Sequence, residues 1–161
     1  MNATAERPID RFFASYSADH QNETNQLIHV FAVPLILWSV IALIWCIPVF
    51  GTLFKSGIWA ALAMFAAWVF YNRLSRPIGY GMLAIFFTMA CVCRLIEQSL
   101  GIQTLLYTAI AVFVAAWIAQ FIGHSKRYEG KKPSFFTDLT YLLIGPIWVL
   151  SKFYRKMGWK Y

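Results

Sequence analysis

The chain has 161 residues, of which 60% are hydrophobic and only 13% charged, and its mean hydropathy is +0.57. Soluble domains carry about 25% charged residues, and a chain this small cannot bury so much apolar surface in water. The composition therefore excludes a disordered chain, a nucleic-acid-binding tail and a disulfide-stapled secreted module, and it favours an integral membrane protein. The net charge of +7 then indicates membrane orientation and contact with lipid headgroups.

The first segment, residues 1–26, is mostly polar but carries an apolar patch near helical spacing. The patch consists of Ile9, Phe12, Phe13 and Tyr16. This spacing predicts a short helix that lies at the membrane interface. A cleavable signal peptide is not expected, because no apolar run follows the first basic residues.

Four apolar stretches approach the length of about 20 residues that a helix needs to cross a bilayer. They run over residues 27–50, 53–71, 78–96 and 100–122. The polar link at 72–77 and the short link at 97–99 are typical of antiparallel hairpins. We therefore expect a single membrane domain over residues 1–161, built as an all-α helical bundle of about four transmembrane helices within residues 27–122.

The last part, residues 123–161, is expected to hold a loop at the cytoplasmic face, a short apolar segment and a basic tail. The apolar segment runs from Leu139 to Leu150 and contains the pair Gly145-Pro146. Twelve residues are too few to cross a bilayer. The segment is therefore predicted to be re-entrant or interfacial.

The positive charges predict how the bundle is oriented. With four crossings, the N-terminus, the second loop and the C-terminal part share one side of the membrane. Twelve of the 14 lysine and arginine residues fall on that side, and only Lys55 and Arg94 fall on the other. The positive-inside rule then places both termini in the cytoplasm, at the inner membrane of a bacterium or the endoplasmic reticulum of a eukaryote.

The three histidines of the chain, His20, His29 and His124, are expected at one membrane face. The first two precede or open the first span and the third closes the fourth, so an even number of crossings separates them. Such a cluster is a candidate metal site, and imidazoles without thiolates suit Fe, Zn, Cu or Ni. The alternative is that each histidine is an ordinary interfacial residue.

The spacing of nine between His20 and His29 requires a break in the helix if both are to meet one ion. Nine residues of a continuous helix turn through about 900°, which leaves the two side chains on opposite faces. Asn22 and Thr24 are good helix caps. We therefore predict that the N-terminal helix ends near His20 and that the first span starts afresh after a turn.

Each histidine has a polar residue four positions earlier, which a helix places beside it. These residues are Tyr16, Asn25 and Gln120. A metal-bound imidazole usually donates its second ring N–H to an acceptor. Asn25 and Gln120 are candidates for that role or for contact with a substrate.

Other charged residues near the same face have two open interpretations. Asp19, Glu129 and Asp138 can complete a histidine-plus-carboxylate site, or they can act as caps and surface charges. The basic cluster that includes Lys131 and Lys132 can pair with anionic lipid or hold the carboxylate of a substrate.

Two segments carry a family resemblance. The first is residues 20–29, HQNETNQLIH, followed by Pro34 and Leu35; the second is residues 120–124, QFIGH, followed by residues 129–133, EGKKP. Together they resemble the signatures of the membrane-bound 2-hydroxy fatty acid dioxygenase family, and the likeness extends over about residues 16–152.

The resemblance implies a ligand set and a group of neighbouring functional residues. His20, His29 and His124 match the family's histidines and would bind Fe(II). Asn25, Gln120 and Glu129 occupy motif positions close to those ligands and are candidate catalytic residues, while Lys131 or Lys132 would place the substrate carboxylate. Some members carry an acidic residue after the proline of the last apolar segment, where this chain has Ser151 and Lys152.

The resemblance also implies a reaction. The characterised eukaryotic member of the family uses Fe(II) and O2 to shorten a 2-hydroxy fatty acid by one carbon in α-oxidation. The expected partners are then the 2-hydroxy fatty acid, O2 and membrane lipid, with no nucleic acid and an oligomeric state that the sequence leaves open. Two alternatives remain: a haem protein with His29 and His124 as axial ligands, and a non-catalytic lipid-binding protein.

Overall fold

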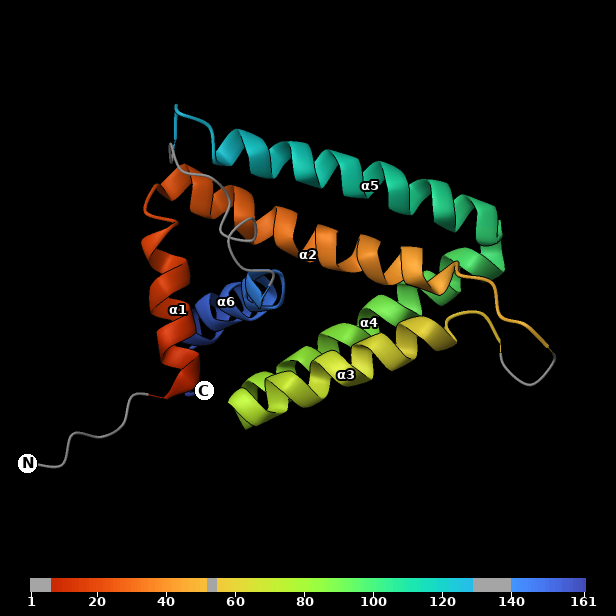
Figure 1. The fold of residues 1–161 in the computed structure, drawn as a ribbon, viewed down its shortest axis with the longest axis horizontal. Helices are drawn as coiled ribbons and strands as arrows, with labels where there is room; N and C mark the ends of the chain where they lie inside the picture. The colour runs from red at the N-terminus through yellow and green to blue at the C-terminus, as the bar shows by residue number, and fades with distance from the viewer. Residues whose placement is uncertain (1–6, 52–54, 129–139) are drawn as a thin grey trace, which may run out of the picture.

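The structure, a computed structural model, describes residues 7–51, 55–128 and 140–161. These ranges contain helices and no strand, as expected for an all-α fold (Figure 1). The helices are α1 (Pro8–Ala18), α2 (Glu23–Trp45), α3 (Ile58–Leu74), α4 (Arg76–Leu100), α5 (Ile102–Gly123) and α6 (Thr140–Lys156).

The long helices form two antiparallel pairs. Helices α2 and α5 lie side by side with the most extensive contact in the fold, and α3 packs along α4 (Figure 1). The pairs approach each other at one end, where Glu97 of α4 accepts hydrogen bonds from Trp45 of α2 at 3.2 Å and from Arg94 at 2.9 Å. They diverge at the other end, where α1 and α6 pack against them.

Three of the helices, α2, α4 and α5, are long and apolar enough to cross a membrane. Helix α3 is apolar but has 17 residues, so it extends about 25 Å where a hydrocarbon core measures about 30 Å. It nevertheless returns the chain along α4 to the end where α2 began (Figure 1). The chain therefore runs along the bundle four times, three times in helices long enough to cross a membrane, and a crossing by α3 stays a prediction.

The predicted break between His20 and His29 is confirmed. Helix α1 ends at Ala18, and α2 begins at Glu23 with Asn22 as its N-cap. The side-chain oxygen of Asn22 accepts a hydrogen bond from the backbone N–H of Asn25 at 3.1 Å. This cap fixes where α2 starts, and with it the depth and direction of the His29 side chain.

The apolar face of α1 is buried against protein. Ile9, Phe13 and Tyr16 are buried, and the helix packs on α6. Helix α6 spans 17 residues with Pro146 inside it, so it extends beyond the apolar run that predicted it. The location of α1 and α6 relative to a membrane surface stays a prediction.

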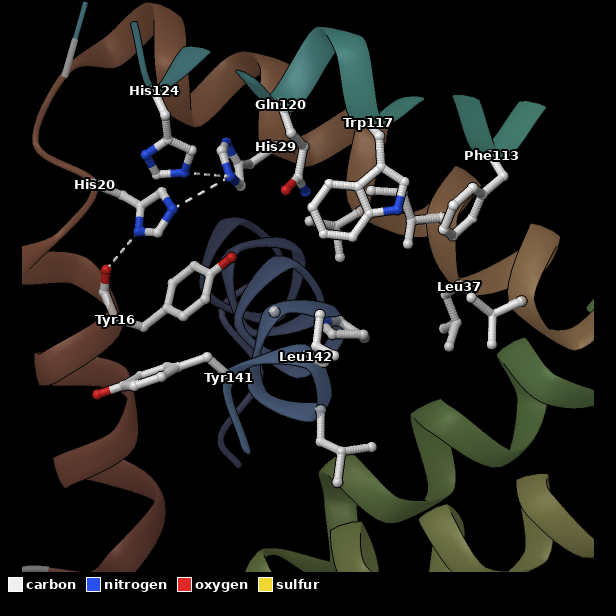
Figure 2. A pocket seen from close by; sticks show the side chains of 16 residues that line it. Tyr16, His20, His29, Leu37, Phe113, Trp117, Gln120, His124, Tyr141 and Leu142 are labelled. Carbon is white, nitrogen blue, oxygen red and sulfur yellow. Dashed lines mark hydrogen bonds between the residues drawn. The ribbon is translucent and has the colours of Figure 1, made fainter. Parts of the chain in front are cut away.

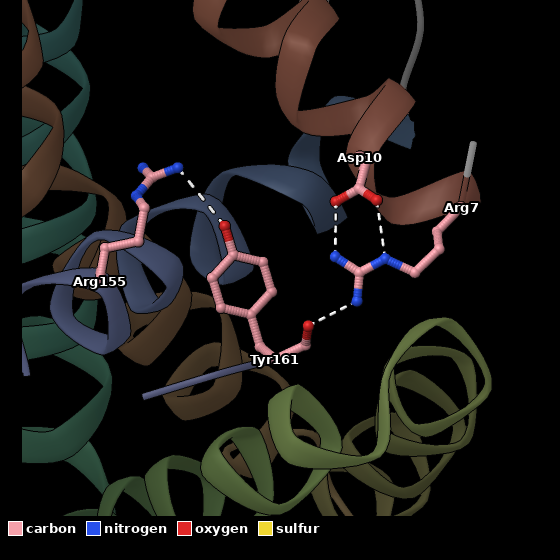
Figure 3. A network of polar contacts seen from close by, with 4 residues as sticks. All are labelled: Arg7, Asp10, Arg155 and Tyr161. Atoms are coloured by element: carbon pink, nitrogen blue, oxygen red, sulfur yellow. Dashed lines mark hydrogen bonds and ion pairs between the residues drawn. The ribbon is translucent and has the colours of Figure 1, made fainter. Parts of the chain in front are cut away.

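A polar contact joins the start of α1 to the end of the chain (Figure 3). Arg7 forms two hydrogen bonds with Asp10, at 2.7 and 2.9 Å, and donates a third to the backbone carbonyl of Tyr161 at 2.5 Å. Exposed ion pairs contribute little to stability. The contact does show that residues 7 and 161 lie together, at the end of the bundle where α2 begins.

Loss of the α2 cap should weaken the fold by a measurable amount. We expect Asn22→Ala to lower the free energy of unfolding by about 1 kcal/mol, because the backbone N–H of Asn25, in the first turn of α2, loses its acceptor. Chemical unfolding in detergent measures the change. Asn22→Asp keeps a capping oxygen and serves as the matched control, so equal losses in both variants would contradict a capping role.

Candidate metal centre

The three histidines come from three different parts of the chain and meet at one end of the bundle. His20 follows α1, His29 lies in the second turn of α2, and His124 is the C-cap of α5. Their exposed fractions are 1%, 1% and 7%. Convergence of these residues at a single depth was predicted from the number of crossings, and the structure brings them together.

The ring nitrogens of the cluster have the spacing of ligands that share one ion. The Nε2 atom of His29 lies 3.2 Å from Nε2 of His20 and 3.2 Å from Nε2 of His124 (Figure 2). Two nitrogens bound to a metal at about 2.1 Å, with an angle of about 90–110° between them, are about 3.0–3.4 Å apart. One ligand nitrogen from each histidine lies within 4.8 Å of the other two.

Backbone carbonyls fix the tautomers of two of the rings. Nδ1 of His20 is 2.7 Å from the carbonyl oxygen of Tyr16, and Nδ1 of His29 is 2.9 Å from that of Asn25. A carbonyl only accepts, so each Nδ1 carries the proton and each Nε2 presents a lone pair. Their 3.2 Å contact therefore sets two lone pairs against each other, an arrangement that a shared cation stabilises.

These carbonyls correct one detail of the sequence-based prediction. Asn25 was a candidate for orienting the histidine four positions later, and it does so through its main-chain carbonyl; the carbonyl of Tyr16, which was not a candidate, does the same for His20. For His124, the carbonyl of Gln120 accepts the backbone N–H at 3.0 Å. A carbonyl has two lone pairs, so those of Tyr16 and Asn25 can each serve a helix and a histidine ring together.

Helices α2 and α5 approach closely where the histidines meet. A Cβ atom added to Gly123 would lie 2.3 Å from Oδ1 and 3.3 Å from Cγ of Asn25, whose side chain is fully buried. Only glycine leaves room for this contact. Because Gly123 directly precedes His124, the contact sets the distance between the α5 histidine and α2.

Aromatic side chains support His20 from the side of α1 and α6. The ring of Tyr16 stacks on the imidazole at a centroid distance of 4.2 Å and an angle of 5°, and Trp148 of α6 packs on Tyr16 at 5.0 Å. Trp148 also donates a hydrogen bond to Ser17 at 2.9 Å. Burial, with a smaller effect of Asp19, raises the pKa of Tyr16, so its hydroxyl stays protonated.

Lys152 supports the same histidine from outside. Its ammonium group donates to the side chain of Gln26 at 2.6 Å, and Gln26 donates to the backbone carbonyl of His20 at 2.7 Å. The ammonium also lies 3.9 Å from the ring centroid of Trp148, which is a cation–π contact. Burial, and then the charge of Arg155, lower the pKa of Lys152.

A cavity of about 340 Å³ opens beside the histidines (Figure 2). Its polar end carries the three imidazoles, the Gln120 side chain and the hydroxyl of Tyr16, and the rest of its wall is apolar. Helices α2, α5 and α6 form this wall. The arrangement can accept a molecule with a polar head at the histidines and an apolar body between the helices.

The structure brings together some of the predicted site residues. Asn25 is fully buried beside Gly123, and Gln120 lines the cavity. Glu129, Lys131 and Lys132 lie outside the described residues, as does the acidic candidate Asp138. Asp19 is the C-cap of α1, in keeping with its predicted role as a cap.

Sequence reasoning missed most of the cavity wall. Phe113 and Trp117 line it, at eleven and seven positions before His124, and Tyr141 lines it from α6. The spacing 113, 117, 120 and 124 places these side chains on one face of a helix, and this was the available signal. It stands out weakly because the other faces of α5 are equally apolar.

Comparison with known proteins identifies the family of the chain. A family model, described as Mpo1-like, 2-hydroxy-palmitic acid dioxygenase Mpo1-like, matches residues 7–157. The 2-hydroxy-palmitic acid dioxygenase MPO1 of Saccharomyces cerevisiae is 25% identical over 146 residues, which cover 89% of this chain and 78% of the yeast protein. No solved structure matches the chain.

Fold and site together define a small all-α membrane protein with a buried cluster of histidines at one end of its bundle. The family match extends over nearly the whole chain and includes all three histidines. The chain belongs to the Mpo1-like family, as its two sequence signatures indicated.

The close approach of α2 and α5 can be tested with a double-mutant cycle. We expect Gly123→Ala to lower the free energy of unfolding by about 2 kcal/mol, because its methyl group overlaps the buried Asn25 side chain. In an Asn25→Ala background the same substitution should cost much less. Chemical unfolding of the four proteins measures both values, and an equal cost in the two backgrounds would contradict the proposed overlap.

Proposed function

We propose that this protein is an iron(II)-dependent dioxygenase that shortens 2-hydroxy fatty acids by one carbon. The observation that carries the proposal is the set of three buried imidazoles at the head of an apolar cavity, with Nε2 of His29 3.2 Å from Nε2 of each of the other two. The yeast relative is a 2-hydroxy-palmitic acid dioxygenase, which supports the substrate class.

The proposed reaction with O2, which needs a redox-active metal, favours iron among the metals that imidazoles bind. His20, His29 and His124 would hold the ion, with their Nε2 atoms as ligands. Zinc has no redox chemistry, so a zinc site does not suit a reaction with O2. Fe(II) on three neutral imidazoles supplies O2 chemistry and keeps positions open for other ligands.

The reaction balances with O2 as the only oxidant. A 2-hydroxy acid and one O2 give the acid one carbon shorter, CO2 and water: the C1–C2 bond breaks, and C2 becomes the new carboxyl carbon. The protein's part is to hold the head of the substrate at the histidines. The protonated hydroxyl of Tyr16 and the amide of Gln120 point into that space as hydrogen-bond donors (Figure 2).

Burial of the site also excludes water from the reacting groups. The histidines are at most 7% exposed, and the cavity wall beyond them is apolar. In such surroundings hydrogen bonds to a substrate carboxylate are stronger than in water. Lys131 and Lys132 stay candidates for the same carboxylate, and Asn25 and Glu129 stay candidate catalytic residues.

The proposed orientation places this site at the cytoplasmic face. The basic residues Arg11, Arg73 and Arg76 lie at the end of the bundle that holds the histidines (Figure 1). By the positive-inside rule that end faces the cytoplasm. A fatty acid would then enter from the adjoining leaflet, with its carboxylate near the surface.

A haem site is less well supported by this geometry. A porphyrin between His29 and His124 needs the two rings on opposite faces of its plane. Their Nε2 atoms are 3.2 Å apart, and His20 presents a third nitrogen at 3.2 Å from His29. A compact ion fits this space better than a macrocycle.

Loss of any one histidine should release the metal. We expect His20→Ala, His29→Ala and His124→Ala each to weaken iron binding by roughly 100-fold or more, because removing a ligand costs more than removing an outer hydrogen bond. Element analysis of the purified proteins measures the bound metal. Gln98→Ala, at an exposed position of α4, is the control. A histidine variant that keeps full occupancy would be removed from the ligand set.

Turnover tests the reaction itself. With Fe(II) and O2, we expect the protein to consume oxygen when given 2-hydroxypalmitate and to release one CO2 for each acid shortened by one carbon. Palmitate and 3-hydroxypalmitate are the matched controls and should give none, because they lack the hydroxyl beside the carboxylate. Oxygen uptake without a shortened acid, or equal uptake with palmitate, would contradict the proposed reaction.

A further inference from the structure

Two stripes of side chains run away from the histidines along the cavity. On α2, the residues at four, eight and eleven positions after His29 are Val33, Leu37 and Val40; on α5, those at seven and eleven positions before His124 are Trp117 and Phe113. All five line the cavity, and the two helices are antiparallel. Both stripes therefore start at the depth of the histidines and run along the bundle in the same direction, away from them.

The stripes have equal length. Eleven residues of helix rise about 16 Å, from His29 to Val40 and again from His124 to Phe113. Half of a hydrocarbon core about 30 Å thick is about 15 Å. The cavity is therefore as deep as one leaflet, which is the depth that the acyl chain of a membrane lipid reaches.

The cavity ends at the level of Val40 and Phe113. Its lining does not continue to the next turn of either α2 or α5, both of which are described along their whole length. Beyond this level Ile41, Ala42 and Ala109 are buried, so the bundle is closed there. Figure 2 shows the histidines at one end of the pocket and Phe113 and Leu37 at the other.

We propose that this cavity is an acyl-chain channel one leaflet deep, and that Val40 and Phe113 at its floor set the longest chain that the protein binds. The inference rests on the proposed function for the head of the ligand, and it adds the path and the length limit of the tail. Each methylene in contact with the wall adds about fourfold to affinity, and methylenes beyond the floor add nothing.

Equilibrium binding tests the proposed length limit without any need for turnover. Saturated 2-hydroxy acids of increasing length compete with a fluorescent fatty acid for the full-length protein in lipid nanodiscs. We expect Val40→Phe to lower the affinity of the longest acids about fifteenfold relative to the short ones, since the larger side chain displaces about two methylenes. Phe113→Ala should make room at the floor, so that affinity continues to rise with chain length for acids longer than the unaltered protein accommodates.

Matched controls lie on the outer faces of the bundle. Val114→Phe adds the same ring at a position 49% exposed on α5, and Phe87→Ala removes one at a position 71% exposed on α4. Both should leave the length profile unchanged. If Val40→Phe does not fold, Phe113→Ala, which only removes atoms, decides the question alone. A variant that changes the affinity of all lengths equally, or a control that shifts the profile, would overturn the proposal.

The result also separates this inference from the proposed function. Acids that bind with the expected length shifts but consume no oxygen would support the channel and contradict the dioxygenase. Oxygen consumption whose dependence on chain length is the same in Val40→Phe, Phe113→Ala and the unaltered protein would support the dioxygenase and overturn the channel.

Discussion

The close contact between α2 and α5 is the constraint on which the site depends. These helices lie far apart in sequence, and their antiparallel pairing places His29 beside His124 with 3.2 Å between the Nε2 atoms. Gly123 permits that approach, because any side chain there would enter the space of Asn25. The break at Asn22 then turns the chain so that His20 completes the cluster. The histidine cluster is thus a property of helix packing.

The same pairing joins the polar and apolar parts of the site. One face of α2 and one face of α5 carry a histidine at the end of the bundle and, apart from Gln120 of α5, apolar side chains along the next three turns. A ligand with a polar head and a long tail can contact both parts at once. Helix α6 closes the remaining side, and its Trp148 and Lys152 hold Tyr16 and the His20 segment in place. Support for the site therefore comes from α1, α2, α5 and α6.

The sequence predicted the helical passes, the break before α2 and the meeting of the histidines, because each follows from length, caps and the number of crossings. It could not predict the cavity wall. In a soluble helix, polar residues mark the outer face, whereas lipid accepts apolar residues and leaves α2 and α5 apolar on every side. Nor could it predict that main-chain carbonyls orient His20 and His29, since every residue carries one.

The central claim is that three imidazoles share one metal ion. X-ray absorption at the iron edge of the purified protein, loaded with Fe(II), tests it directly, because scattering from imidazole rings reports how many of them bind the metal. We expect three imidazoles per iron in the unaltered protein and two in His124→Ala loaded with an excess of Fe(II). A spectrum without imidazole, or one with the scattering of a porphyrin, would contradict it.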